Sequence, residues 1–302
     1  MTTPDYWKKY YVIGTDADKI ERSIEPEKFL SEGGSFDMVC FKKNKNTPNI
    51  LISPGSAGHS YVFAELGYQM HIRGYNVFIM PKHGGVTITK LMQRHTDAIR
   101  FIAANYSDRI GVFAEGLGGY ACFYLALANG SMKSSVYMNA PVIMTEEKFQ
   151  EAWMQGNGAA KRRKIILPFA KLMYKIFPKL KLPIRLYLDF KEMVDTKEDN
   201  WKIEMPLVER FSKDPDFDKR YPLSAILSLV YTPPPQPVSY LKVSTMFLVP
   251  VRGFFPSYEK DLYNRLPDVR KKIIEVDGGV FWMVSHPYEA AKIICQWFDE
   301  TL

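Results

Sequence analysis

The stretch Ala114-Glu115-Gly116-Leu117-Gly118-Gly119 lies between a short apolar run, residues 109–113, and a longer one, residues 119–128. The first run predicts a buried strand and the second predicts an apolar helix. A small-x-x-x-Gly turn at such a strand-to-helix corner is the arrangement that exposes a nucleophilic side chain. The corner residue here is Gly116, which has no hydroxyl, thiol or carboxylate. The turn therefore indicates chemistry at a nucleophilic side chain, but the nucleophilic atom itself is missing.

The rest of the chain mostly alternates strands and helices. We expect strands at residues 10–13, 36–41, 49–52, 75–80, 109–113, 134–138, 245–251 and 272–276, and helices at residues 61–73, 88–106, 118–128 and 286–298. Several of these strands are continuous apolar runs, as in strands covered on both faces, whereas the first two are more typical of an antiparallel edge. The alternation predicts an α/β fold with a mostly parallel central sheet flanked by helices.

Residues 145–240, called the cap segment below, break this rhythm. They are rich in Met, Lys and helix formers, show no convincing strand, and end in the proline-rich connector 231–237. Helix-like stretches near 146–154, 165–177 and 183–193 are separated by Gly or Pro, and prolines 168, 178 and 183 argue against one long amphipathic helix. We therefore expect a core of residues 1–144 and 241–302 and a helical cap, or lid, of residues 145–240.

Composition places the chain among ordinary globular proteins, with 46% hydrophobic residues in 302. The N-terminus has no apolar segment typical of a secretory signal, and no window approaches the roughly 20 apolar residues of a membrane span. Cys40, Cys122 and Cys295 are far apart in apolar patterns, which predicts buried free thiols in a reducing compartment. We expect a cytoplasmic protein.

The formal charge of +7 has a local origin in the cap segment. Ten Lys or Arg residues lie between Lys161 and Lys191, against the single acid Asp189. A solvated helix face explains this pattern most simply. A surface that contacts an anionic membrane or an anionic substrate tail is the alternative. Nucleic acid is disfavoured because no recognised binding motif accompanies the charge.

Three further loops follow predicted strand ends. They are Ile52-Ser53-Pro54-Gly55-Ser56-Ala57-Gly58-His59-Ser60, Arg252-Gly253-Phe254-Phe255-Pro256, and the run from Val276 to His286-Pro287 that contains Gly278-Gly279-Val280. Together with the 114–119 turn, and in this order, they resemble the α/β-hydrolase superfamily, in the style of esterases and monoacylglycerol-lipase-like enzymes with a helical cap. The resemblance covers roughly residues 36–144 and 240–302 and leaves the cap segment unmatched.

The resemblance implies a role for each loop. The backbone amides of Ser56 and Leu117 would form an oxyanion hole, which can survive because amides do not depend on side-chain identity. The nucleophile position is Gly116. The acid position falls on Arg252 or Gly253, between which the sequence does not decide, and the position of the basic histidine is Val280.

None of the three triad groups is therefore present. A serine nucleophile needs a base within hydrogen-bond reach, and the base needs an orienting acid. The pattern predicts a serine esterase or lipase scaffold for hydrophobic acyl esters, disabled by drift or by engineering. The alternative is a non-catalytic pseudo-hydrolase that binds a small apolar or acyl ligand under its cap. Nothing in the sequence calls for a cofactor or a metal ion.

Other side chains could replace the missing groups only if they had partners. The candidate nucleophiles are Cys122, Ser53, Ser56 and Ser60, and the candidate bases are His59, His83, His95 and His286. Cys122 lies inside the apolar helix, and the serines have no evident base. His83 follows a strand end and could face the pocket, whereas His286 is expected to start the last helix. Beyond the acid position, Glu259 and Asp261 are expected on a solvated helix.

Overall fold

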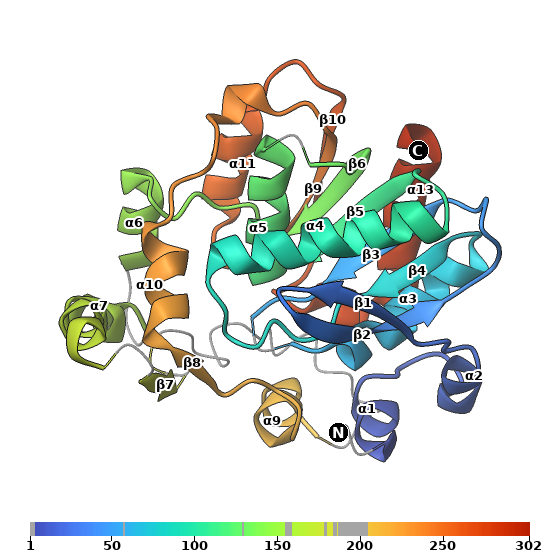
Figure 1. Cartoon of the computed structure of the whole chain (residues 1–302), viewed down its shortest axis with the longest axis horizontal. Helices are drawn as coiled ribbons and strands as arrows, with labels where there is room; N and C mark the ends of the chain where they lie inside the picture. Colours follow the sequence, from blue (N-terminus) through green and yellow to red (C-terminus); the bar gives the residue numbers. More distant parts are fainter. Residues whose placement is uncertain are drawn as a thin grey trace.

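The protein is built on an eight-stranded sheet, whose strands lie side by side in the order β1-β2-β4-β3-β5-β6-β9-β10 (Figure 1). A computed structural model describes residues 4–56, 58–128, 130–154, 159–177, 180–183, 186 and 205–302. The strands are β1 (Glu27–Ser31), β2 (Gly34–Phe41), β3 (Asn49–Ser53), β4 (Asn76–Ile79), β5 (Ile110–Glu115), β6 (Ser134–Met138), β9 (Ser244–Pro250) and β10 (Lys271–Val276).

The central strands are parallel and fully buried. β2 pairs antiparallel with β1 and β4, and every other pairing in the sheet is parallel. Every residue of β3, β4, β5 and β6 is buried, as expected for strands covered on both faces. The predicted mostly parallel sheet with an antiparallel edge is thus confirmed.

Helices cover both faces of this sheet. Figure 1 shows α4 (Ile88–Asn105), α5 (Gly116–Leu127) and α11 (Pro256–Arg265) on one side of the strands, with α3 (Ala64–Ile72) and α13 (Pro287–Thr301) on the other side. The side chain of Thr87 caps α4 by accepting the N–H of Lys90. The shorter elements are α1 (Pro4–Tyr10), α2 (Ala17–Arg22), η1 (Ser60–Phe63) and α12 (Trp282–Ser285).

The cap segment leaves the sheet after β6 and returns at β9. Its described elements are α6 (Glu147–Met154), α7 (Ala159–Ile176), β7 (Lys181–Pro183), α9 (Leu207–Lys213), β8 (Arg220–Pro222), α10 (Leu223–Tyr231) and η4 (Val238–Tyr240). Helix α7 packs against α6 and α10, at the left edge of Figure 1. Within the described ranges, no helix has the length and apolar character needed to cross a bilayer.

Two local predictions were wrong. Residues 10–13 form no strand, because α1 runs to Tyr10 and buries Trp7 and Tyr11 at helical spacing. The cap segment does contain strands, since β7 and β8 pair antiparallel. The expected helix near 165–177 is confirmed as part of α7, which continues through Pro168 to Ile176; Lys164 and Pro168 are both exposed, so water can bind the carbonyl group that lacks an N–H partner. Most of the expected helix 183–193 lies outside the described residues.

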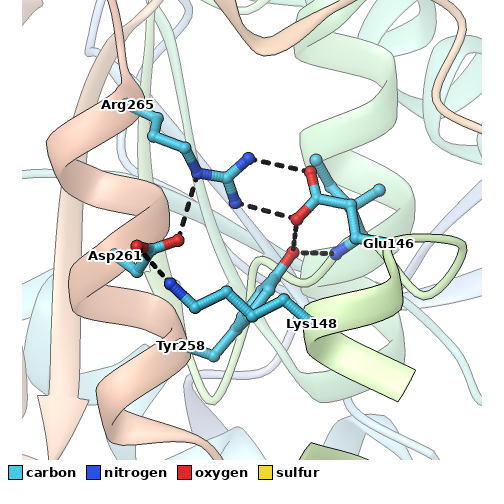
Figure 2. Close-up of polar contacts among 6 residues, drawn as sticks. Glu146, Lys148, Tyr258, Asp261 and Arg265 are labelled. Atoms are coloured by element: carbon cyan, nitrogen blue, oxygen red, sulfur yellow. Dashed lines mark hydrogen bonds and ion pairs between the residues drawn. The ribbon is translucent and has the colours of Figure 1, made fainter. Parts of the chain in front are cut away.

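A polar cluster fastens the first helix of the cap segment to α11 (Figure 2). Arg265 donates two hydrogen bonds to the carboxylate of Glu146, at 2.9 and 2.8 Å, and the hydroxyl of Tyr258 donates to the same carboxylate at 2.8 Å. Lys148 pairs with Asp261 at 2.6 Å. Because this geometry is bidentate and networked, it fixes where the cap segment begins better than an isolated surface pair would.

A second junction involves the buried carboxylate of Asp214, at the end of α9. It accepts hydrogen bonds from the hydroxyl of Tyr11 at 2.6 Å and from His59 Nε2 at 2.8 Å. Burial opposes ionisation, yet the hydrogen bonds from His59 and Tyr11 hold the pKa of Asp214 below its usual value. The N-terminal region, the loop after β3 and the cap segment therefore meet at one carboxylate.

Candidate active site

The corner between β5 and α5 retains the geometry of a nucleophile position. β5 ends at Glu115 and α5 begins at Gly116, whose φ of +50° lies in the left-handed region. A Cβ atom built on Gly116 would lie 3.4 Å from Gly55 Cα and 3.9 Å from Ser56 N. A side chain at position 116 would therefore point toward the amide of Ser56 without a severe clash, although a non-glycine residue there would be strained.

The next two glycines let α5 pack directly on its neighbours. A Cβ atom on Gly118 would lie 2.2 Å from Ser53 Oγ and 2.4 Å from the carbonyl oxygen of Pro54, and one on Gly119 would lie 2.5 Å from Ala140 Cβ. No real contact is this short, so the helix can sit at this distance from β3 only without these side chains.

We predict that Gly118→Ala lowers the free energy of unfolding by about 1–3 kcal/mol, the usual cost of overpacking a core. Urea unfolding followed by circular dichroism measures this change. Gly14→Ala is the matched control, because its nearest contact, Glu65 Oε1, would lie 3.7 Å away. Equal stability of the two variants would contradict the proposed close approach.

The expected oxyanion-hole residues lie together at this corner. Ser56, Gly116 and Leu117 all line the cavity described below. A Cβ atom on Gly116 would lie 3.9 Å from Ser56 N, while Leu117 is the next residue along the chain. The two residues predicted to supply the amide donors therefore line one cavity, and their role in an oxyanion hole stays a prediction.

The two candidates for the acid position point in different directions. Arg252 forms an ion pair with Asp277 at the surface. Gly253 lies inward, and a Cβ atom built on it would be 3.1 Å from Asn139 Oδ1. Asn139 Nδ2 in turn donates to the backbone carbonyl of Val280 at 2.7 Å. Gly253 and Val280 are therefore brought together through Asn139, and Arg252 is not.

Asn139 was missed by the sequence analysis. It directly follows β6, adopts a left-handed φ of +52°, and is only 8% exposed. Its Oδ1 is buried without a hydrogen-bond partner among the described residues, and the residue lines the cavity. The amide fills the space beside Gly253 that an acid side chain would need. An Asn directly after a parallel strand was the only available sequence signal.

The cavity has a volume of about 110 Å³ and lies at the carboxyl end of the parallel strands. Its wall combines the β5–α5 corner with loops after β3, β4, β6, β9 and β10 and with three parts of the cap segment. The lining residues are Ser56, Gly85, Val86, Ile88, Glu115, Gly116, Leu117, Tyr120, Asn139, Val142, Met144, Phe149, Trp153, Tyr221, Ala225, Ile226, Leu229, Phe254, Phe255 and Phe281. Apolar and aromatic side chains dominate, and this described wall includes no histidine or cysteine.

Glu115 is the second residue that the sequence analysis missed. It is 4% exposed, lines the cavity and accepts a hydrogen bond from the Gly55 amide. Its carboxyl group lies so close to the loop that a Cβ atom on Gly55 would be 1.9 Å from Oε2. Burial is the main cause that raises the pKa of Glu115 to about 8. The carboxyl group is therefore neutral at pH 7 and ties the loop after β3 to the corner.

The raised pKa of Glu115 predicts how the stability of the protein depends on pH. Between its ordinary pKa of 4.5 and about 8, the folded protein holds a proton there that the unfolded chain releases, so stability falls as pH rises. Between pH 6.5 and 8, the free energy of unfolding of Glu115→Gln should fall less steeply than that of the native chain, by about 1.4 kcal/mol per pH unit. Urea unfolding at several pH values measures it. The exposed Glu289→Gln should keep the wild-type slope, and an unchanged slope in Glu115→Gln would contradict the assignment.

A serine and a histidine do pair beneath the corner, contrary to expectation. Ser53 Oγ donates to His95 Nε2 at 2.6 Å, since His95 Nδ1 donates to the carbonyl of Leu91 at 2.7 Å. Burial lowers the pKa of His95 to about 4, so it is neutral. Both residues are 0% exposed and neither lines the cavity, which leaves no room for a substrate. The pair joins α4 to β3.

Two of the other predicted substitutes, His83 and Cys122, lie away from the cavity, whereas Ser56 lines it in a described wall without a histidine. His83 does not line the cavity, because its Nε2 donates to the carbonyl of Pro54 at 2.6 Å, and burial lowers its pKa to about 3. Cys122 is buried in the core, and burial raises its pKa. Glu259 is not solvated as expected: it is 2% exposed and burial raises its pKa well above the usual value. Within the described ranges, no cluster of three His, Cys, Asp or Glu residues could hold a metal ion.

Solved structures of other proteins superpose on most of this chain. A soluble variant of monoglyceride lipase from Saccharomyces cerevisiae, in complex with a substrate analogue, matches with a TM-score of 0.67 at 13% identity over 92% of this chain and 95% of that one. The monoacylglycerol lipase of Paleococcus ferrophilus gives 0.62 at 16% identity, over 92% and 99%. The alpha/beta hydrolase GrgF from Penicillium sp. sh18 gives 0.66 at 12% identity, over 92% and 98%.

The chain has the fold of the α/β-hydrolase superfamily, as its sequence motifs predicted. No protein-family model and no curated protein sequence matches it. At identities this low, structural likeness extends to the fold, while the chemistry has to be argued from the residues at the corner.

Proposed function

We propose that this protein binds a small apolar or acyl ligand under its cap segment and does not hydrolyse esters through a Ser-His-Asp triad. The observation that carries the proposal is the composition of the cavity wall. The β5–α5 corner is present, and Ser56 and Leu117, whose amides are the predicted donors, line the cavity, but position 116 is glycine and the residue expected to be the base, Val280, is 0% exposed. This arrangement can hold and polarise an acyl group but contains no activated nucleophile.

The wall of the cavity supports an apolar ligand. Phe149 and Trp153 of α6, Ile226 of α10, and Phe255 and Phe281 from the loops after β9 and β10 all line the cavity. The rings of Phe149 and Phe255 lie 4.7 Å apart, which gives a rigid aromatic side to the cavity. Neutral Glu115 and the unpartnered Oδ1 of Asn139 are the buried polar groups that a ligand head group would meet.

We expect the native chain to give no turnover of p-nitrophenyl butyrate above a buffer control. Restoring the triad should create activity. Gly116→Ser with Val280→His supplies nucleophile and base, and the acid can be placed by Gly253→Asp or, where the structure already holds a side chain, by Asn139→Asp. Either set should raise kcat/KM by roughly a hundredfold or more, a small part of the ~10⁶ that a complete triad supplies.

The matched control carries Gly116→Ala with the same base and acid substitutions, so that only the hydroxyl differs. Brisk hydrolysis by the unmodified chain, with labelling by a serine-directed fluorophosphonate, would overturn the proposal. Failure of both folded acid placements to gain activity over the alanine control would show that the corner is not shaped for acyl transfer.

The ligand-binding half of the proposal has its own prediction. Native mass spectrometry of the purified chain, or displacement of a fluorescent fatty-acid probe, should reveal binding of an acyl chain. Ala225→Trp fills the cavity from α10 and should weaken probe binding at least tenfold, because the added ring occupies the volume of the acyl chain.

Ser224→Trp is the matched control, since Ser224 directly precedes Ala225 on α10 but does not line the cavity. If both variants bind the probe as the native chain does, or if the native chain binds no acyl compound at millimolar concentration, the cavity is not the site.

A further inference from the structure

The outward side of α7 carries a row of large apolar side chains. Ile165, Phe169, Leu172 and Ile176 recur at i, i+4, i+7 and i+11, which places them on one side of a helix. Their exposed fractions are 75%, 50%, 59% and 61%. The opposite side of the helix is buried at Leu167 and Ala170, where α7 packs against its neighbours α6 and α10. The row therefore exists in addition to the apolar contacts that hold α7 to the protein.

Lysines accompany this row along the helix. Lys164, Lys171 and Lys175 share the spacing i, i+7 and i+11, so they form a parallel line beside the apolar side chains. The sequence of α7 contains no Asp or Glu, and none occurs from its start to Asp189. The ammonium group of Lys171 lies 5.2 Å from the centre of the ring of Tyr231, so this lysine lies beside the end of α10. Positive charge at this surface is thus unopposed by acids of the same helix.

We propose that this side of α7 is a docking surface for an anionic lipid bilayer. A helix whose apolar side enters the boundary between head groups and acyl chains, with lysines at the level of the lipid phosphates, is the arrangement that binds such a surface in the plane of the interface. A nucleic acid would engage the lysines but leave the apolar row in water, so it fits the surface less well. An acidic protein groove is the other occupant to distinguish, and in that case the folded native chain would not bind vesicles.

The position of α7 gives the docking a consequence. The two helices that α7 packs against, α6 and α10, contribute Phe149, Trp153 and Ile226 to the cavity wall. A docked protein would therefore hold the cap segment, rather than the sheet, against the bilayer. The proposal concerns a surface outside the cavity and does not depend on what the cavity binds.

The test is co-sedimentation with vesicles of phosphatidylcholine, with and without 30% phosphatidylserine, at low and high salt. Binding should require the anionic lipid and weaken with salt. Lys164→Ala with Lys171→Ala and Lys175→Ala should weaken binding about a hundredfold, since each lysine near an anionic surface contributes about fivefold. Phe169→Ser with Leu172→Ser should weaken it at least tenfold. Leu30→Ser, at a 78% exposed apolar residue of β1, is the control that should bind normally.

A second measurement reports insertion directly. The native cysteines Cys40, Cys122 and Cys295 are buried, and burial raises the pKa of each thiol, so a cysteine introduced at the surface can be labelled selectively. An environment-sensitive fluorophore on Phe169→Cys should shift to the blue on addition of anionic vesicles. The same fluorophore on Leu30→Cys should not shift.

Each alternative outcome overturns the proposal. Equal binding to neutral and anionic vesicles, or binding that the α7 variants leave unchanged, would show that another surface is used. A fluorophore at position 169 that responds only to heparin or to double-stranded DNA would assign the lysines to a polyanion without a bilayer. Absence of vesicle binding by the folded native chain would end the proposal, whatever the result of the ligand assays.

Discussion

The structure depends on the abrupt turn between β5 and α5. β5 ends at Glu115 and α5 starts at the next residue, Gly116, with no loop between them. This turn requires a left-handed backbone at position 116 and bare glycines at 118 and 119, because Ser53, Pro54 and Ala140 occupy the space beside them. The same close approach brings the loop after β3 under the corner. Ser56 and Leu117 line the same cavity because these backbones can approach so closely.

The scaffold around the corner is held by uncharged polar groups rather than by catalytic ones. Neutral His95 binds Ser53, neutral His83 binds the carbonyl of Pro54, and neutral Glu115 binds the amide of Gly55. Two of these contacts hold the loop that carries Ser56, the third holds the end of β3 from which that loop starts, and none involves a triad position. Loss of nucleophile, acid and base can therefore leave the shape of the site intact, since the groups that define its shape are different from the groups that would react.

The sequence predicted the elements whose signals are local. Continuous apolar runs identified β3, β5 and β6, and the glycine pattern identified the corner between β5 and α5. Elements governed by distant contacts were missed. The aromatic run at residues 10–13 resembles a strand, but burial of Trp7 and Tyr11 against distant parts of the chain favoured a helix and turn. β1 was missed because Phe29 is its only buried large apolar residue.

The same distinction explains the result at the site. Glu115 was visible in the sequence, but its role depends on Gly55, sixty positions earlier, and the Ser53–His95 pair spans 42 positions. Whether Arg252 or Gly253 faces inward depends on the turn after β9, which directs Arg252 to Asp277. Asn139 lies beside Gly253 because β6 pairs with β9, which the sequence does not reveal. No periodicity or composition within a short window encodes these contacts.

The carboxylate of Asp214 joins three stretches of chain that are remote in sequence, and a charge held this way cannot be released by one of them alone. If the segment carrying Tyr11 were cut away or displaced, the buried carboxylate would keep, among the described residues, His59 and the Asp216 amide as its donors, a costly condition in a low-dielectric interior. Residues 4–11 therefore help to hold α9 of the cap segment in place. Any displacement of α9 away from the sheet has to carry α1 with it or break the hydrogen bonds to Asp214.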